Sequence, residues 1–373
     1  MINLIKKLLI LNFLLFFPTS LLALNSSTFL ISQSAFKNHD YTTSLSSFDL
    51  NEIGLINNDS IDKLIAAIIV EDLNLAYDIA SEILLKDYEN QEAHVVKLTY
   101  LLSNNKLNKI NEIKQNSNFN NELIDFIFFN NDNIKDTKTV SKSFVDIVIS
   151  SYSDVDQNSL NYNFLLFYIS LSKLIDPTND RAAIIKGELF QNLKKEKIAR
   201  KIFENIKEDS PFFSEAQKSL AYNYSSFLPF KVAENNLKNL LENSKDNYSI
   251  KKILADFYRY EKRYELAISI YNDLINLNMD DVWNIYYMRG ICYERMDNWN
   301  KAEEDFITSL SIKSNSPNVL NYLAYGWVER GIKLNKSLNM LKEAYESNPD
   351  SYYIIDSLAW AHFKKNNLEE AAR

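Results

Sequence analysis

A small residue recurs at nearly constant spacing through the C-terminal half of this chain of 373 residues. The intervals between successive small residues are 34, 34, 35, 34 and 35 positions. The residues are Gly187, Ala221, Ala255, Gly290, Ala324 and Ala359. A fixed period of this length indicates a chain built from one repeated supersecondary unit. No other feature of the sequence constrains the fold as strongly.

Three further sets of residues recur in step with these small residues. Three positions later stand Phe190, Tyr224, Tyr258, Tyr293, Trp327 and His362. Twelve or thirteen positions later stand Ala199, Ala233, Ala267, Ala302, Ser337 and Ala371. Sixteen or seventeen positions later stand Phe203, Leu237, Tyr271, Phe306 and Leu341. These three sets and the first small residues are together called the packing positions.

The packing positions predict pairs of helices in close contact. A small residue lets two helices approach, an aromatic residue one turn later fills the adjacent space, and the second small residue leaves a matching gap on the partner helix. Glycine inside a helix costs about 1 kcal/mol relative to alanine, so Gly187 and Gly290 need a packing reason. Polar turns such as Arg295–Asn298 and Lys364–Asn367 separate the two helices. We therefore predict an all-α fold of stacked antiparallel helical hairpins.

Several segments of residues 180–373 resemble the tetratricopeptide repeat family. They are "IYYMRGICYERMDNWNKAEEDFITSLSI", "YIIDSLAWAHFKKNNLEEAAR" and "NYLAYGWVERGIKLNKSLNMLKEAYESNPD", the last of which resembles the version common in exported bacterial members. The resemblance implies a right-handed α-solenoid with about six repeats in residues 180–373. Ser309, Ser314 and His362 depart from the residues that the family favours, namely alanine, proline and tyrosine.

The region before residue 180 keeps helical periodicity with less regular spacing. Residues 24–133 are predicted to form degenerate hairpins of the same type, for example in Leu64–Tyr88. Residues 134–179 are predicted to be an irregular helical hairpin that links them to the regular array. Only five glycines and six prolines occur in the whole chain, which favours long helices with short connections.

The first 23 residues have the layout of a secretory signal. Lys6 and Lys7 precede the apolar run Leu8–Phe17, and Ala23 stands at a plausible cleavage point. An uncleaved membrane anchor is the alternative, although the run is short for a bilayer of about 30 Å. We therefore expect a periplasmic protein without a stable transmembrane span after cleavage. The net charge of −8 disfavours a general nucleic-acid binder, which needs clustered cations.

The sequence shows no residue pattern typical of a catalytic, cofactor or metal site. His39, His94 and His362 are isolated, and no two glycines stand within two residues of each other, so neither a metal motif nor a phosphate loop is evident. Cys292 is the only cysteine, and its simplest interpretation is a small core residue. Paired acids such as Glu303 and Glu304 are predicted to be solvated. We expect no catalytic, cofactor or metal site in this chain.

The resemblance implies a concave groove lined by the first helix of each hairpin. A peptide would find aromatic rings for its side chains and amides for its backbone there. The candidate residues are Tyr222, Lys252, Arg259, Asn284, Tyr287, Ile291, Asn318, Asn321, Tyr325, Asp356 and Trp360. Packing against the next repeat is the alternative role for each. Asp256 stands where family members that bind chaperone tails need an asparagine beside Lys252, which disfavours that ligand.

Two functions follow from these observations. The first is a non-enzymatic periplasmic scaffold that binds proteins or peptides in cell-envelope assembly or maintenance. The second is an accessory or regulatory region of an enzyme, such as a transferase or protease, whose catalytic domain lies beyond residue 373. The last hairpin, which stops two residues after Ala371, is expected to be truncated, as in a fragment of a longer chain.

Overall fold

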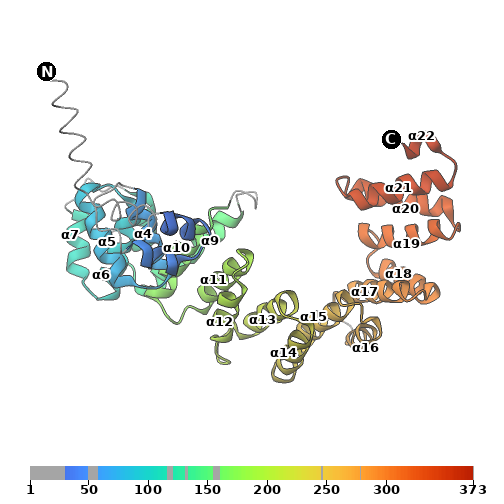
Figure 1. Cartoon of the computed structure of the whole chain (residues 1–373), viewed down its shortest axis with the longest axis horizontal. Helices are drawn as coiled ribbons and strands as arrows, with labels where there is room; N and C mark the ends of the chain where they lie inside the picture. The colour runs from blue at the N-terminus through green and yellow to red at the C-terminus, as the bar shows by residue number, and fades with distance from the viewer. Residues whose placement is uncertain are drawn as a thin grey trace, which may run out of the picture. The chain divides into compact units, whose positions relative to one another are not determined.

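The computed structural model describes residues 30–48, 58–115, 121–130, 133–153, 160–244, 247–277 and 279–372. Almost all of these residues are helical, and successive helices pair in hairpins (Figure 1). The predicted all-α helical-repeat fold is confirmed, whereas the handedness of the solenoid stays a prediction. The predicted signal, residues 1–23, lies outside the described residues.

The chain divides into two compact units, Met1–Ala216 and Gln217–Arg373. The elements of the first unit are α3 (Tyr41–Phe48), α4 (Asn58–Ile69), α5 (Leu73–Lys86), α6 (Gln91–Ser103), α7 (Leu107–Gln115), α8 (Glu122–Phe128), β1 (Phe129–Asn130), β2 (Asn133–Ile134), α9 (Thr137–Ser153), α10 (Tyr162–Ile175), α11 (Asp180–Asn192) and α12 (Glu196–Glu204). Helix α13 (Phe213–Phe227) begins in this unit and continues into the second. The second unit continues with α14 (Phe230–Asn243), α15 (Asn247–Tyr260), α16 (Tyr264–Ile275), α17 (Val282–Arg295), α18 (Trp299–Ile312), α19 (Pro317–Glu329), α20 (Leu334–Ser347), α21 (Tyr352–Lys364) and α22 (Leu368–Ala371). The domain boundary that the sequence suggests at residue 180 lies inside the first unit and stays a prediction.

Helix α10 forms the centre of the first unit. It packs against α4, α6, α9 and α11, and side chains on all its sides are buried, including Leu166, Tyr168 and Leu171 at 0% exposure. A helix that is apolar all round needs neighbours all round, which explains why α10 contacts helices before and after it in the chain.

A two-stranded ribbon interrupts the helices between α8 and α9. Strands β1 and β2 pair antiparallel, with Phe129 opposite Ile134 and Asn130 opposite Asn133. The sequence analysis predicted helical periodicity through this asparagine-rich segment and did not foresee the ribbon. Strands of two residues are too short to show the alternation that identifies a strand in a sequence.

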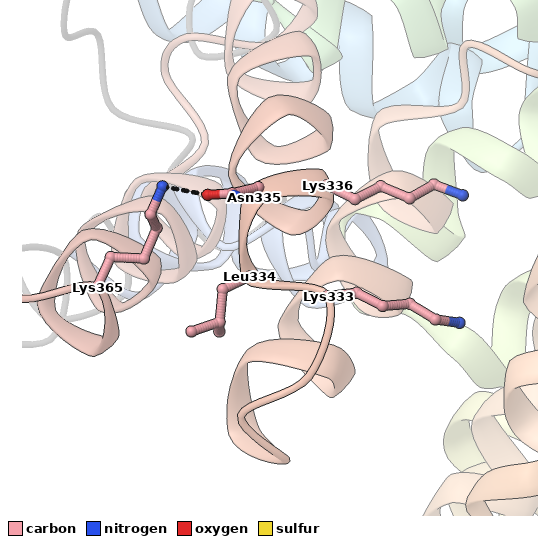
Figure 2. Close-up of a pocket in the computed structure, with 5 residues that line it drawn as sticks. All are labelled: Lys333, Leu334, Asn335, Lys336 and Lys365. Carbon is pink, nitrogen blue, oxygen red and sulfur yellow. Dashed lines mark hydrogen bonds between the residues drawn. The ribbon is translucent and has the colours of Figure 1, made fainter.

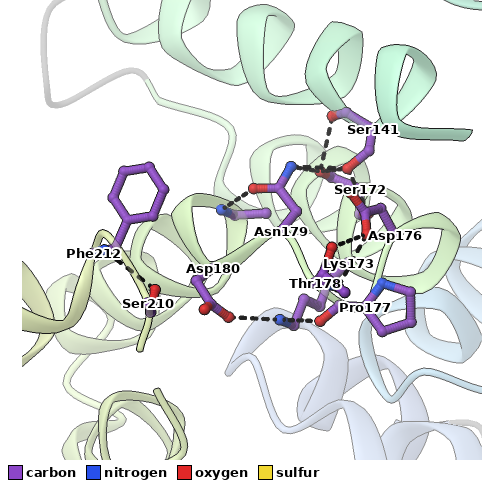
Figure 3. Close-up of polar contacts among 11 residues, drawn as sticks. Ser141, Ser172, Lys173, Asp176, Pro177, Thr178, Asn179, Asp180, Ser210 and Phe212 are labelled. Carbon is purple, nitrogen blue, oxygen red and sulfur yellow. Dashed lines mark hydrogen bonds and ion pairs between the residues drawn. The ribbon is translucent and has the colours of Figure 1, made fainter. Parts of the chain in front are cut away.

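A buried network of hydroxyl groups fixes α9 against α10. The Oγ atoms of Ser141 and Ser172 lie 2.8 Å apart, and each hydroxyl also reaches the other residue's carbonyl oxygen at 2.9 Å. Asn179 donates from Nδ2 to Ser141 Oγ at 2.8 Å, while its Oδ1 accepts from the N–H of Ala182 at 3.1 Å and caps α11 (Figure 3). One asparagine therefore joins three helices, because buried polar groups are stable only when hydrogen-bonded.

The packing positions of the second unit form its core, as predicted. Residues with 0% exposure include Ala221, Ala233, Leu237, Ala255, Ala267, Tyr271, Ala302, Phe306, Ala324, Trp327, Ser337 and Leu341. Four packing positions of this unit are only half-buried, namely Tyr224, Tyr293, Ala359 and Ala371. The recurring spacing is thus a packing pattern, and Gly290, Ala302 and Phe306 are buried within the segment that carries it.

Two glycines occupy packing positions because a side chain would collide there. A Cβ atom at Gly290 would lie 2.7 Å from Phe306 Cε1, and one at Gly187 would lie 2.4 Å from Phe203 Cε1. Both distances are shorter than carbon atoms tolerate, so each glycine lets a ring on the second helix press against the first helix. This is the packing reason that the sequence analysis required for these glycines.

The turns of the hairpins share a left-handed residue. Lys262, Asp297 and Asn366 have φ values of 57°, 57° and 62°. The next residue then bonds back to the end of the first helix, as in the 2.9 Å bond from Asn298 N–H to the Tyr293 carbonyl oxygen. This pattern closes the first helix as a left-handed cap does, so the polar turns predicted at 295–298 and 364–367 are confirmed.

Cys292 is fully buried with a free thiol, and burial raises its pKa to about 12, as expected for a core residue without a reactive thiolate. Among the described residues, no helix combines the length and the apolar character that crossing a bilayer requires.

Candidate functional site

The predicted groove residues all lie on the first helices of hairpins. They are Tyr222 on α13, Lys252 and Arg259 on α15, Asn284, Tyr287 and Ile291 on α17, Asn318, Asn321 and Tyr325 on α19, and Asp356 and Trp360 on α21. The structure brings the α19 and α21 members together, because the Tyr353 hydroxyl of α21 donates to Asn318 Oδ1 at 2.8 Å. Tyr222 is 48% exposed on α13, and Asn284 is half-buried near the start of α17.

Two of the candidates on α17 are core residues. Tyr287 and Ile291 are each 7% exposed and belong to one apolar cluster with Phe306. The Tyr287 ring centroid lies 5.5 Å from that of Tyr322 in an edge-on arrangement and 6.1 Å from that of Phe306. These contacts match the alternative role, packing against the next hairpin, and leave little surface for a ligand.

Both predicted cations have acidic partners within the second unit. Lys252 Nζ lies 2.5 Å from Asp281 Oδ2, and the same carboxylate accepts from the Tyr248 hydroxyl. Burial alone would raise the pKa of Asp281, but these two bonds lower it overall. Arg259 lies 3.5 Å from Asp256. Lys252 therefore joins α15 to the residue that precedes α17, whereas the ion pair of Arg259 lies within α15.

Asp256 and Arg259 belong to a second polar group on α15 and α16. The Tyr271 hydroxyl donates to Asp256 Oδ1 at 2.6 Å, and the Arg259 guanidinium lies 4.5 Å from the centroid of the Tyr260 ring. Burial is the main reason that the pKa of the Tyr271 phenol is raised. Asp256, which stands where a chaperone-tail receptor needs asparagine, thus has an internal structural partner.

Four residues of α19 and α21 form an exposed surface, which is called the acidic aromatic face. They are Tyr325, Glu329, Asp356 and Trp360. Tyr325 is 40% exposed, Glu329 and Asp356 are exposed, and Trp360 is half-buried. The Trp360 indole N–H donates to Glu329 Oε1 and so ties α21 to α19. Glu329 was missed by the sequence analysis, although it follows Tyr325 by four residues and therefore lies one turn along the same helix face.

The electrostatic environment of Tyr325 is negative. Burial raises the pKa of its phenol, and the carboxylates of Glu329, Asp356 and Glu294 raise it further because they oppose a phenolate charge. Arg295 acts in the opposite sense, but it lies 3.4 Å from Glu294 in an ion pair. The acidic aromatic face thus presents a net negative potential around an exposed ring.

Asn321 lies one turn before Tyr325 on α19 and has an unusual environment. The residue is only 6% exposed, and its Oδ1 atom has no hydrogen-bond partner in the part of the chain that the structure describes. An unpaired buried acceptor costs about 1 to 3 kcal/mol, so such a group in a folded protein needs an explanation. This oxygen is closed off from solvent in the structure, so the N–H group of a ligand reaches it only after the Asn321 side chain rotates toward the surface.

A separate hollow of about 660 Å³ lies beside α20. Lys333, Lys336 and Lys365 line it with Leu334 and Asn335. Figure 2 shows that Lys333 and Lys336 point to one side of α20, whereas Lys365 lies on the other side and donates to Asn335 Oδ1 at 2.6 Å. Lys333 also pairs with Glu303 at 2.6 Å. The three ammonium groups therefore do not converge on one anion.

Glu303 corrects one expectation about charged residues. It was predicted to be solvated, but its side chain is only 21% exposed and its Oε1 accepts from Trp327 Nε1 at 2.7 Å as well as from Lys333. Glu304, the next residue, is exposed as predicted. Among the described residues, no three His, Cys, Asp or Glu side chains gather in a way that could hold a metal ion.

Comparisons with known proteins agree with a helical-repeat chain. A TPR repeat-containing protein of Pseudomonas aeruginosa, PA4667, is 24% identical over 90 residues, which is 24% of this chain and 15% of that protein. BBSome complex member BBS4 of mouse is 26% identical over 98 residues, or 26% and 18% of the two chains. This chain therefore spans less than a fifth of either relative. It matches no protein-family model.

Solved structures with related folds include the Cut9–Hcn1 hetero-tetramer of APC/C and Pseudomonas aeruginosa PilF. The first is 16% identical, with a TM-score of 0.46 over 82% of this chain and 56% of that chain. The second is 17% identical, with a TM-score of 0.45 over 53% and 88%. This similarity is too low to support an inference about a ligand.

Proposed function

Because this is an all-α chain of tetratricopeptide-type repeats, we propose that it is a non-enzymatic scaffold that binds an extended segment of another protein. The proposed binding surface is the acidic aromatic face together with Asn321. One observation carries this proposal: the Oδ1 atom of Asn321 is buried without an internal partner and lies one turn from the exposed ring of Tyr325.

The chemistry of these two residues suits a peptide. The Asn321 oxygen accepts one hydrogen bond, and a backbone N–H of an extended segment is a donor that every peptide carries except at proline. The Tyr325 ring offers a rigid apolar surface with few rotatable bonds, and tyrosine is among the residues that contribute most to protein interfaces. The buried acceptor and the exposed ring would thus hold a backbone and a side chain of the same ligand.

Substitution of these residues tests the proposal. The probe is a displayed library of random twelve-residue peptides, from which binders to the chain are selected. The double substitution Asn321→Ala, Tyr325→Ala should weaken binding of the selected peptides at least about tenfold, because loss of an interface anchor costs more than 1 kcal/mol. Fluorescence anisotropy measures the affinities, and circular dichroism checks that the fold is retained.

Tyr345 provides a matched control. It is 40% exposed, as Tyr325 is, but it lies on α20, a second helix. Tyr345→Ala should leave the affinities unchanged. Equal losses from the two tyrosine substitutions, or unchanged affinity in the Asn321 and Tyr325 variant, would place binding elsewhere on the chain.

We also propose that the scaffold acts in the periplasm, in assembly or maintenance of the cell envelope. The support is the layout of residues 1–23, with two lysines, an apolar run and Ala23. Expressed with its own N-terminus in a Gram-negative bacterium, the chain should be recovered from the periplasm with Leu24 as its first residue. Mass spectrometry of the purified protein measures this. Recovery of the uncleaved chain from the membrane fraction would instead support the anchor.

A further inference from the structure

The two carboxylates of the acidic aromatic face have no basic partner. Asp356 makes no ion pair, and Glu329 accepts only from the Trp360 indole, within the part of the chain that the structure describes. The buried or partly buried carboxylates of Asp305 and Asp281 are instead paired, with Arg289 and Lys252 respectively. The carboxylates of Glu329 and Asp356 are therefore available to an external cation.

Two adjacent helices bring these groups together. Tyr325 and Glu329 are four residues apart on α19, and Asp356 and Trp360 are four residues apart on α21, so each pair shares one helix face. The bond from Trp360 to Glu329 connects the two faces, and the charges of Glu329 and Asp356 both act on Tyr325. The two carboxylates therefore lie close to the same exposed ring.

Two cations lie near the acidic aromatic face. Arg295 is held by Glu294 at 3.4 Å. Lys364 lies 4.8 Å from the centroid of the Trp360 ring, which itself stacks on Phe363 with centroids 5.1 Å apart. Neither cation forms an ion pair with Glu329 or Asp356. Lys364 instead shows that the rings of this region accept an ammonium group, as cation–π geometry allows.

We propose that the acidic aromatic face binds a basic peptide segment and holds a lysine or arginine side chain between Glu329 and Asp356, against the ring of Tyr325. The carboxylates supply charge-assisted hydrogen bonds and the ring supplies a cation–π contact. Rotation of the Asn321 side chain, whose oxygen is closed off from solvent in this structure, lets it accept a backbone N–H of the same segment. This inference rests on the proposed peptide-binding function and specifies the charge of its ligand.

Three labelled probe peptides test the sign of that charge. Each has nine residues, blocked ends and alternating serine, and the other positions are all Lys, all Gln or all Glu. In fluorescence anisotropy at low salt, the Lys probe should bind at least about tenfold more tightly than the Gln probe, and the Glu probe should not bind. Added salt of about 0.5 M should remove most of the difference, because exposed charges are screened.

Substitutions at the carboxylates identify the site. The variant Glu329→Gln, Asp356→Asn should lose about tenfold or more in affinity for the Lys probe and keep its affinity for the Gln probe. A variant with Glu329→Lys and Asp356→Lys should instead prefer the Glu probe. The control Glu343→Gln, Glu346→Gln removes the same charge from exposed positions of α20 and should change nothing.

The outcomes separate this inference from the proposed function. If the library yields peptides that need Tyr325 but carry no excess of Lys or Arg, the scaffold function stands and the charge preference is wrong. Equal losses in the control variant would mean that the net charge of −8, and not this face, attracts the probe. If neither the library nor any probe binds, both proposals fall.

Discussion

Replacement of Phe306 by alanine should lower the free energy of unfolding of the second unit by about 3 to 5 kcal/mol, as deletion of a buried phenylalanine ring does. The Phe306 side chain is 0% exposed and fills the space that Gly290 leaves open. Its ring also lies 6.0 Å from the Tyr322 ring and 6.4 Å from the Trp299 ring, measured between centroids. The cavity would therefore open at the contact of α17, α18 and α19.

Urea unfolding and hydrogen exchange measure this loss. The transition of the second unit should shift to lower urea, and amides of α17, α18 and α19 should lose protection together. Ile307→Ala is the matched control, because Ile307 is the next residue of α18 and is 47% exposed. Its effect should stay within about 0.5 kcal/mol. A Phe306→Ala protein as stable as the control would contradict the packing described for α17 and α18.

Replacement of Arg289 by alanine should lower the free energy of unfolding by a similar amount, roughly 3 to 5 kcal/mol, because it leaves a buried carboxylate without its partner. Arg289 Nε and Nη2 donate to the two oxygens of Asp305 at 2.9 and 2.6 Å. The Asp305 side chain is 5% exposed and that of Arg289 is 17% exposed. The pair joins α17 to α18 directly beside Phe306.

The loss of unfolding free energy caused by Arg289→Ala should depend on pH. Burial raises the pKa of Asp305 above its ordinary value, and Arg289 opposes that shift. Without Arg289, the folded protein binds a proton at Asp305 at a pH where the unfolded chain has released it. Stability then falls as pH rises from the unfolded pKa, about 3.9, through the higher folded pKa. The loss should therefore be smaller near pH 4 than at pH 7.

Urea unfolding of the wild-type and variant chains at both pH values tests this sign. The double variant Arg289→Ala, Asp305→Asn removes the titrating group, so its own stability should change less between the two pH values than that of the single variant. It should also recover part of the stability lost at pH 7. A single-variant loss that is equal at the two pH values would mean that Asp305 stays solvated.

The hairpins could be predicted from the sequence because their packing positions recur. Gly290, Ala302 and Phe306 stand at spacings that repeat in several units, and each of these residues is buried. Because the same spacing occurs in several units, an atypical residue in one unit does not hide it. The repeated pattern therefore predicts the fold, which one hairpin alone would not do. The β1–β2 ribbon has no such repetition and was missed for that reason.

Polar pairs across the hairpins could not be predicted in the same way. Asp305 and Glu303 are charged residues on a second helix, for which exposure is the usual environment. Asp305 pairs with Arg289 and Glu303 pairs with Lys333 only at one rotation of the paired helices about their axes. The hydrophobic spacing in the sequence does not determine that rotation. The sequence analysis therefore classed Glu303 as solvated, which the structure contradicts.

The groove prediction depended on the same rotation. Successive residues of a helix differ by about 100° around its axis, so a small error in orientation moves a side chain from a groove into a contact with the next hairpin. Tyr287 and Ile291 lie on the packed side, whereas Tyr325 and Asp356 are exposed. The role of all these residues in binding stays a prediction.

The separation of buried packing residues from exposed residues affects how the sequence of such a chain can evolve. Phe306, Ala302 and Gly290 are shielded from the surface, and their replacement disrupts neighbouring hairpins. Exposed residues such as Tyr325 and Asp356 can be exchanged at a cost usually within about 0.5 kcal/mol. Selection can therefore alter ligand preference one side chain at a time while the architecture is inherited intact.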